Sequence, residues 1–244
     1  MRREEPIGRS FRRFFCEKLP ESGEVEIGDQ EAHHLLHVLR MKVGDKLELF
    51  DGRDCSAAGV VEELLKRSVR VRIESKSRVS VELPFRLVIA AAVPKGDRQQ
   101  FMVEKLVELG CTELWPVTYQ RSSVKIEKKT VMRWRRYVLE ASKQCGRNRL
   151  MEIGEPISSR EVFAADVFAG DRWLADPYSS QPLELSGGPS DSLIAVGPEG
   201  GLTEEELGTA REREWRTGHL GPRILRLETA AMAVAARALS LIHI

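Results

Sequence analysis

Apolar residues follow two different patterns along the chain, and the change between them divides it into two parts. Up to about residue 75, apolar and polar positions alternate in short runs, which is typical of half-buried strands. These runs lie at residues 25–27, 46–50, 59–61 and 69–73. The run at 46–50 meets Asp51-Gly52, a strong hairpin signal. With one helix expected from Glu31 to Arg40, residues 1–75 are predicted to form a small β-barrel.

The second pattern begins after residues 76–84, which mix serines and charges with isolated apolar residues and are predicted to be a linker. Continuous apolar runs then alternate with stretches of helical periodicity. Buried strands are expected at 85–93, 114–117, 172–175 and 193–196, and helices at 97–110 and 130–145, the first capped by Asp97 and ended by Gly110. Strands alternating with helices indicate a parallel sheet. We therefore predict an α/β domain over residues 85–244.

Two loops near the C-terminus have the same design. The run Leu193–Val196 ends at Gly197-Pro198, and Thr203 with Glu206 forms the signature of a capping box that starts a helix. A second short strand ends at Leu220, a Gly-Pro turn follows, and an alanine-rich helix begins near Glu228. Ligands of α/β proteins bind beyond the carboxyl ends of parallel strands. Neither loop is a GxGxxG motif or a P-loop, so they do not indicate a dinucleotide or a nucleoside triphosphate.

Charge is unevenly distributed, although the formal net charge of the 244 residues is only +1. Residues 86–150 hold 14 Lys and Arg against 6 Asp and Glu, whereas residues 151–220 hold 5 against 14. A basic block in a neutral chain indicates a polyanion partner, and a solvated helix face is the alternative. Phe11-Arg12-Arg13-Phe14-Phe15 adds arginines for phosphates, while Phe14 and Phe15 are expected in the core.

The sequence indicates no metal site, no disulfide framework and no membrane segment. The cysteines at 16, 55, 111 and 145 form no CxxC motif, and His33, His34 and His37 have no carboxylate partner pattern, so no metal and no disulfide framework are expected. No signal peptide follows Met1, and the longest apolar run is too short to span a bilayer. A cytoplasmic protein without a membrane segment is expected.

GPEGGLTEEE at 197–206 and LGPRILRLETA at 220–230 resemble the paired signatures of the bacterial small-subunit ribosomal RNA uridine-N3 methyltransferases, within the trefoil-knotted SPOUT methyltransferases. The resemblance covers nearly the whole chain. It implies a PUA-like RNA-binding barrel, a knotted SPOUT domain, S-adenosylmethionine as cofactor, small-subunit ribosomal RNA as substrate, and a homodimer through the knotted domain. Leu227 stands where the family usually has threonine, which weakens any role for a hydroxyl there.

The resemblance also assigns residues. It implies cofactor contacts at Gly197, Pro198, Glu199, Gly201, Leu220, Gly221, Arg223, Ile224, Leu225, Thr229 and Ala230. It implies RNA contacts at Arg12, Arg13, Arg40, Lys95, Lys105, Arg121, Lys125 and Arg147.

Two residues are candidates for catalysis. Methylation at uridine N3 requires the uracil anion to be favoured, and a cation near its oxygens does so, which makes Arg226 the first candidate. Glu228 is either a base or a helix-start residue that stabilises the macrodipole, and we favour the latter. Two other functions stay open: a knotted methyltransferase acting on another atom such as a ribose 2′-hydroxyl, and a non-catalytic RNA-binding or ribosome-assembly factor.

Overall fold

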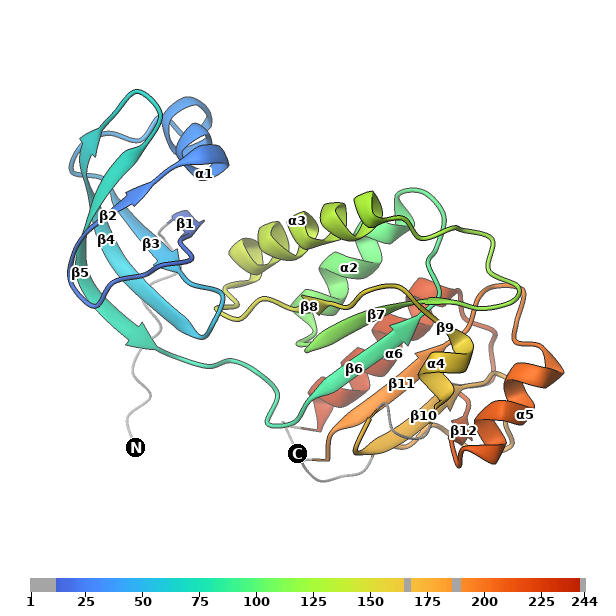
Figure 1. Cartoon of the computed structure of the whole chain (residues 1–244). Helices are drawn as coiled ribbons and strands as arrows, with labels where there is room; N and C mark the ends of the chain where they lie inside the picture. The colour runs from blue at the N-terminus through green and yellow to red at the C-terminus, as the bar shows by residue number, and fades with distance from the viewer. Residues whose placement is uncertain (1–11, 165–167, 186–189, 242–244) are drawn as a thin grey trace. The chain divides into compact units, whose positions relative to one another are not determined.

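The computed structural model describes residues 12–164, 168–185 and 190–241. Phe11, from the segment of arginines and phenylalanines at 11–15, lies outside these ranges. The sequence Ser186-Gly187-Gly188-Pro189-Ser190 predicts a loop, and most of it also lies outside them. The chain forms two compact units (Figure 1). The first contains the described residues up to Val81 together with Ser142–Leu150, and the second contains Glu82–Ala141 and the described residues from Met151 onward.

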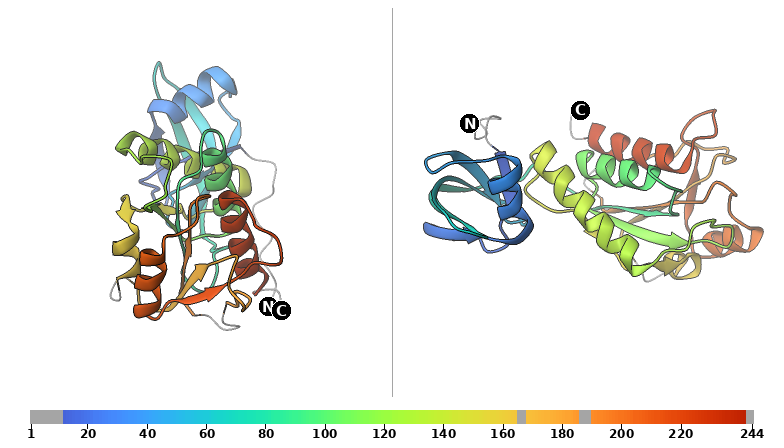
Figure 2. Two further views of the ribbon diagram at one scale, coloured as in Figure 1. Left: turned by 90° about the vertical axis from the view of Figure 1, so that its right-hand side faces the viewer. Right: turned by 90° about the horizontal axis from the view of Figure 1, so that it is seen from above.

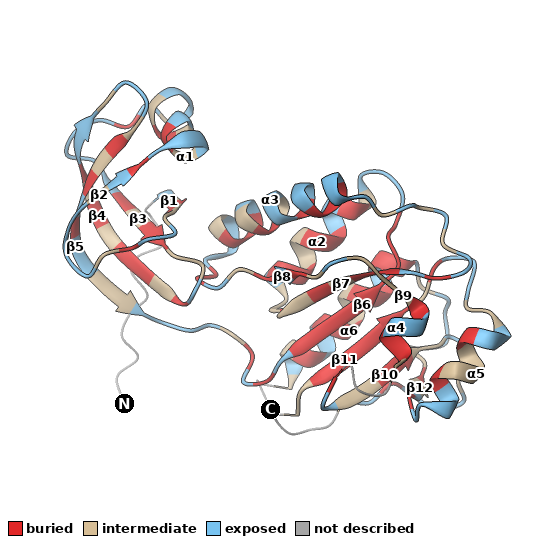
Figure 3. Ribbon diagram, viewed as in Figure 1, coloured by how far each residue is buried: buried red, intermediate tan, exposed pale blue. Residues whose placement is uncertain are grey.

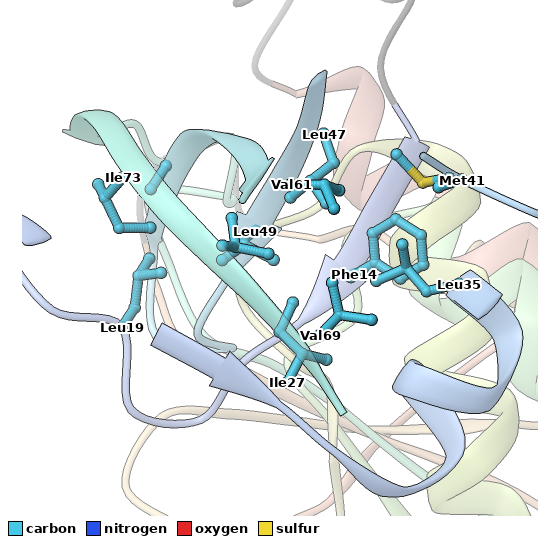
Figure 4. Packing of buried hydrophobic residues seen from close by; sticks show 12 residues of the cluster. Phe14, Leu19, Ile27, Leu35, Met41, Leu47, Leu49, Val61, Val69 and Ile73 are labelled. Carbon is cyan, nitrogen blue, oxygen red and sulfur yellow. The ribbon is translucent and has the colours of Figure 1, made fainter. Parts of the chain in front are cut away.

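The first unit is a five-stranded mixed sheet around an apolar core. Its strands, in sheet order, are β1 (Arg12–Phe15), β3 (Lys46–Phe50), β4 (Cys55–Leu64), β5 (Val69–Arg78) and β2 (Gly23–Ile27). β1 pairs with β3 in parallel, and the other pairs are antiparallel. The inward-facing residues of the alternating runs, such as Leu47, Leu49 and Val61, pack with Phe14 and Leu35 (Figure 4). The strand prediction for this part is confirmed, but β5 continues to Arg78, into the segment expected to be a linker.

The helix expected at 31–40 differs in start and in geometry. It begins earlier, as α1 (Asp29–His33), and continues as a π-helical turn, η1 (His34–Val38). The N–H of Leu39 donates to the carbonyl of His34, five residues back, at 2.9 Å. The wider turn leaves Leu35 buried and Val38 exposed, so the apolar face is narrower than the sequence pattern indicated.

The segment Ser142–Leu150 returns from the second part of the sequence and completes the first unit. Arg13 donates to the carbonyl oxygen of Ser142 at 3.0 Å, and the N–H of Leu150 donates to the carbonyl of Gly52 at 3.2 Å. Arg149 pairs with Asp54, and Lys143 pairs with Glu31. These contacts are polar and distant in sequence, so no hydrophobic periodicity indicates them.

The second unit contains a sheet in which every pair of described strands is parallel. Its order is β12 (Arg216–Gly218), β10 (Asp171–Ala175), β11 (Ser192–Val196), β6 (Leu87–Ala91), β7 (Glu113–Thr118) and β8 (Glu152–Ile153), and β9 (Ile157–Ser158) also pairs with β7. The central strands β6 and β11 are buried along their whole length (Figure 3). Their continuous apolar runs are typical of a sheet covered on both faces. The predicted parallel sheet is confirmed.

Helices cover both faces of this sheet (Figure 2). α2 (Arg98–Glu108) and α6 (Leu227–Ser240) pack together on one face, and α4 (Ser159–Phe163) and α5 (Glu204–Glu212) lie on the other. α3 (Lys128–Cys145) buries Trp134, whose indole N–H donates to Gln99 at 3.2 Å, as expected for a core residue. Asp97 occupies the N-cap position of α2, as predicted, but its side chain makes no capping hydrogen bond.

Candidate functional site

A cavity of about 420 Å³ lies at one edge of the parallel sheet in the second unit. β12, β10 and β11 are adjacent and parallel, so their carboxyl ends meet at that edge. The segments that follow these three strands build the wall. The lining residues are Arg121, Ala175, Asp176, Pro177, Tyr178, Val196, Gly197, Pro198, Glu199, Gly200, Gly201, Leu202, Glu204, Leu207, Leu220, Arg223, Ile224, Leu225, Leu227 and Ala230.

The loop after β11 is held in place from both ends. A capping box joins Thr203 and Glu206, as predicted from the sequence. Glu206 also accepts a hydrogen bond from the backbone N–H of Gln120 at 2.9 Å. Although burial alone would raise it, these backbone donors hold the pKa of Glu206 below its ordinary value. Glu206 is therefore ionised at neutral pH and ties the loop to the end of β7.

Arg121 fixes the glycine-rich part of the same loop. Its Nη1 lies 3.1 Å from the carbonyl oxygen of Gly200 and 3.4 Å from that of Leu202. Gly201 has a φ of +71°, a conformation that glycine adopts without strain. A Cβ at Gly197 would lie 2.4 Å from Cδ1 of Leu202, so this glycine allows the loop to close on itself.

The segment after β12 supplies the apolar part of the wall. The strand ends at Gly218, two residues before the predicted end, because the N–H of His219 pairs with the carbonyl of Gln181 at 2.8 Å. His219 then accepts a hydrogen bond on Nδ1 from the N–H of Gly221 at 3.1 Å, which sets the turn. Leu220 and Leu225 follow in the wall, with the exposed Ile224 between them.

The third part of the wall, after β10, was not foreseen. Asp176, Pro177 and Tyr178 form a turn in which the N–H of Tyr178 donates to Oδ1 of Asp176 at 3.0 Å. The turn presents an exposed tyrosine ring at the cavity. The strand before it was predicted, and Asp-Pro directly after a strand is a turn signal. Its adjacency to the other two loops depends on sheet order, which the sequence pattern does not reveal.

Most of the implied cofactor residues meet at this cavity. Gly197, Pro198, Glu199, Gly201, Leu220, Arg223, Ile224, Leu225 and Ala230 all line it. Gly221 and Thr229 do not, although each is next to a lining residue. Leu227, the position that departs from the family, is buried and contributes to the wall as an apolar side chain.

The two catalytic candidates differ in their surroundings. Arg226 is exposed and occupies the N-cap position of α6, where its carbonyl accepts the N–H of Ala230 at 2.8 Å. Glu228 is buried in the first turn of the same helix and pairs with Arg98. Neither side chain lines the cavity, and each lies directly beside Leu227, which does.

The implied RNA-contact residues fall into three groups. Arg12, Arg40, Lys95 and Lys125 are exposed. Lys105 pairs with Glu108 at 2.7 Å, and Arg121 holds the cavity loop.

Arg147 is buried and Arg13 is half-buried. Arg147 is 3% exposed, and the head group of Arg13 is engaged inside the first unit. Neither position favours contact with a phosphate at the surface, and the RNA contacts of these two residues stay a prediction.

The described residues contain no group of three His, Cys, Asp or Glu side chains arranged to hold a metal ion. Within the same ranges, no helix is long and apolar enough to cross a membrane.

Comparison with known proteins matches both units. The family model described as RNA methyltransferase domain matches residues 81–239. The family model described as RNA methyltransferase PUA domain matches residues 27–74. The chain is 31% identical over 239 residues to ribosomal RNA small subunit methyltransferase E of Bacillus subtilis, covering 91% of this chain and 93% of the relative. The enzyme of the same name from Synechocystis is 29% identical over 221 residues, which cover 87% of this chain and 72% of the relative.

A solved structure extends the similarity to three dimensions. The crystal structure of a ribosomal RNA small subunit methyltransferase E from Neisseria gonorrhoeae bound to S-adenosyl methionine has a TM-score of 0.87 with this chain. It is 29% identical and covers 95% of this chain and 98% of its own. The predicted fold class is confirmed for a PUA-like first unit and an α/β domain with a mainly parallel sheet, and the knotted SPOUT topology stays a prediction. These matches show that the chain belongs to the ribosomal RNA small subunit methyltransferase E family.

Proposed function

We propose that this protein uses S-adenosylmethionine to methylate N3 of a specific uridine in small-subunit ribosomal RNA. The observation that carries the proposal is the cavity at the ends of β10, β11 and β12, where both glycine-proline loops meet. The relative from Neisseria gonorrhoeae was crystallised with S-adenosyl methionine, and its fold matches this chain over both units. The proposed substrate lies in the cytoplasm.

The cavity has the size and the chemistry that the cofactor requires. Its volume of about 420 Å³ is within the range of small-ligand sites, about 300–1,000 Å³. Leu202, Leu220 and Leu225 offer apolar surface for an adenine ring, and the backbone around Gly197 and Ile224 offers hydrogen-bonding groups. The carboxylates of Glu199 and Asp176 are suited to ribose hydroxyls or to an ammonium group. When bound, S-adenosylmethionine supplies an electrophilic methyl group.

The protein's own contribution to the reaction is positioning and electrostatic. Uridine N3 must lose a weakly acidic proton, and a cation near the uracil oxygens stabilises the resulting anion. Arg226 is exposed and stands at the start of α6, directly after the cavity-lining Leu225, so we assign it this role. Glu228 is buried against Arg98, and we assign it a structural role rather than that of a base.

RNA would bind along exposed basic side chains of the second unit. The outer face of α3 and the loop before it carry Lys125, Lys128, Lys129, Arg133, Arg135 and Arg136, all exposed. Met132, on the same face, is also exposed and offers an apolar contact. Lys129 pairs with Glu127 at 2.8 Å, and Arg133 donates to Gln99 at 2.8 Å. A bound polyanion would neutralise the positive charge that remains on this face.

The active form would be a homodimer through the SPOUT domain. On α6, Ala231, Ala235 and Ala238 are fully buried within their own unit. The outward side is formed by the half-buried Met232 and Ala233 and the exposed Ala236. Small side chains allow close approach of a second copy, and the family resemblance implies a partner at this domain.

The proposal is tested with ribosomal RNA from a strain that lacks this protein. The RNA should lack one 3-methyluridine by nucleoside mass spectrometry, and purified protein with small subunits and S-adenosylmethionine should restore it. Restoration of a 2′-O-methylnucleoside instead would assign the reaction to a ribose hydroxyl. If calorimetry detects no binding of S-adenosylmethionine, the protein is a non-catalytic RNA-binding factor.

A further inference from the structure

One arginine joins two carboxylates from separate parts of the second unit. Arg98 is the first residue of α2, and its Nη1 lies 3.2 Å from Oε1 of Glu199 and 3.4 Å from Oε1 of Glu228. Glu199 belongs to the loop after β11 and lines the cavity, whereas Glu228 belongs to the first turn of α6. The guanidinium therefore connects the cavity loop to the helix that closes the same cavity.

The two carboxylates differ in their access to water. The side chain of Glu228 is 6% exposed, and its Oε2 is buried without a hydrogen bond to any residue in the described ranges. A carboxylate in such a place is strongly destabilising unless a cation lies beside it. The contact with Arg98 supplies that cation. Because the Glu228 side chain is enclosed, it is placed to hold Arg98 rather than to meet a substrate.

Arg98 and Glu199 are more accessible, with side chains 35% and 38% exposed. An ion pair between two such groups is weak by itself, because water screens it and both side chains lose rotamer freedom. The contact with Glu228 changes this, since a guanidinium already fixed by a buried partner loses less freedom when it pairs with Glu199. Glu199 is thereby oriented at the cavity.

We infer that Arg98 is a positioning residue for the cofactor site, with Glu228 as its buried anchor and Glu199 as the group that it orients. The inference rests on the proposed use of S-adenosylmethionine, and it is independent of which RNA atom is methylated. It assigns functions to Arg98, which no sequence motif singled out, and to Glu228, for which a base and a structural residue were both considered.

Calorimetric titration with S-adenosylmethionine tests the connection. Arg98→Ala and Glu199→Gln should each raise Kd about tenfold. The double variant should bind no more weakly than Arg98→Ala alone, because both substitutions remove one link. Glu108→Gln is the matched control, since it removes an ion pair from the same helix, and its Kd should equal that of the wild type. If the increase in Kd of the double variant equalled the product of the two single increases, the inference would be overturned. An unchanged Kd in Arg98→Ala would overturn it as well.

Glu228→Gln separates an anchor from a base. As an anchor, Glu228 should affect Kd, so the variant should bind the cofactor more weakly yet keep kcat and its pH profile at saturating cofactor. A variant with wild-type Kd and no turnover would identify a base and refute the inference. A lower unfolding temperature with unchanged Kd would show that Glu228 only stabilises the fold through its ion pair, and this result would also refute the inference. Failure of the wild type to form 3-methyluridine, with these Kd effects intact, would refute only the uridine-N3 assignment.

Discussion

Arg13 and Glu48 face each other across the parallel pairing of β1 and β3, and Nε of Arg13 lies 3.0 Å from Oε2 of Glu48. Their side chains are only 9% and 15% exposed. The same guanidinium donates to Ser142 and Asn148 and lies over the ring of Phe50, 4.7 Å from its centroid. One arginine thus joins the first strand, its neighbour and the returning segment, which explains why its side chain is largely enclosed.

Removal of this arginine should destabilise the first unit. Arg13→Ala leaves the half-buried carboxylate of Glu48 without its cation, and the loss should approach the cost of breaking a buried pair, about 3 kcal/mol. Arg12→Ala is the control, since Arg12 is exposed and donates one hydrogen bond to the carbonyl of Leu39 at 3.0 Å, worth about 1 kcal/mol at most. Urea unfolding followed by circular dichroism measures both. Equal losses in the two variants would contradict the structural role of Arg13.

Glu48 should make stability depend on pH. Burial raises the pKa of Glu48 above its ordinary value of 4.5, although Arg13 acts in the opposite direction. The folded state then binds the proton more tightly than the unfolded state. This contribution to stability is complete below pH 4.5 and is lost as pH rises through the folded pKa.

The matched variant is Glu48→Gln, which has no titrating group at this position. Its free energy of unfolding should change less between pH 4 and pH 7 than that of the wild type, in urea titrations at about five pH values. A parallel pH dependence in the two proteins would show that other groups produce it.

Sequence patterns indicated the strands and the two glycine-proline loops because those features depend on neighbouring residues. The third loop of the cavity depends on sheet order instead. Asp176 and Tyr178 reach the cavity because β10 lies between β12 and β11, an order that no local pattern encodes. Arg98 was missed for a similar reason, since its two partners are about 100 and 130 residues away along the chain.

The low exposure of the Arg13 and Arg147 side chains could not be predicted from the sequence either. Both lie in arginine-rich surroundings that are typical of an RNA surface, and exposure depends on contacts made by Ser142–Leu150. Arg13 is held by an ion pair with Glu48 and by hydrogen bonds to Ser142 and Asn148, all distant in sequence from it. Hydrophobic periodicity reports only which face of an element is apolar.

Gly197 should be essential for cofactor binding. A Cβ there would lie 2.4 Å from Cδ1 of Leu202, so Gly197→Val displaces the side chain of this cavity-lining leucine. Calorimetry should detect no binding of S-adenosylmethionine to this variant. Gly208→Ala is the control, because a Cβ at that position in α5 meets nothing within 4 Å and alanine favours the helix by about 1 kcal/mol. Wild-type affinity in a folded Gly197→Val protein would refute the assignment of the cavity.

RNA affinity should depend on the outer face of α3. Lys128→Ala combined with Arg136→Ala removes two exposed cations, so RNA binding should weaken. The slope of the logarithm of the binding constant against the logarithm of the salt concentration should fall by about one for each lost phosphate contact. The control combines Arg211→Ala with Arg213→Ala, which changes net charge equally at exposed positions near the end of α5. Filter binding to small-subunit RNA at several salt concentrations compares the two double variants with the wild type. Identical behaviour of both double variants would show that only net charge matters.

The homodimer should depend on the outward side of α6. Ala236 is exposed between Ala235 and Ala238, which are buried in the same unit, so a substitution at Ala236 leaves the internal packing intact. Ala236→Arg places a long charged side chain where a second copy would approach, and desolvating it there without a partner is unfavourable. Light scattering should then give 27.5 kDa, the mass of one chain, instead of twice that mass for the wild type.

The monomer should also be inactive, because the family resemblance further implies that each cofactor site lies close to the partner chain of the proposed dimer. Its circular dichroism and unfolding temperature should match those of the wild type, which separates loss of assembly from loss of folding. Glu212→Arg introduces the same side chain at an exposed position of α5 and should leave a dimer with full activity. A monomeric Ala236→Arg protein that still methylates small subunits at the wild-type rate would show that one chain contains the complete active site.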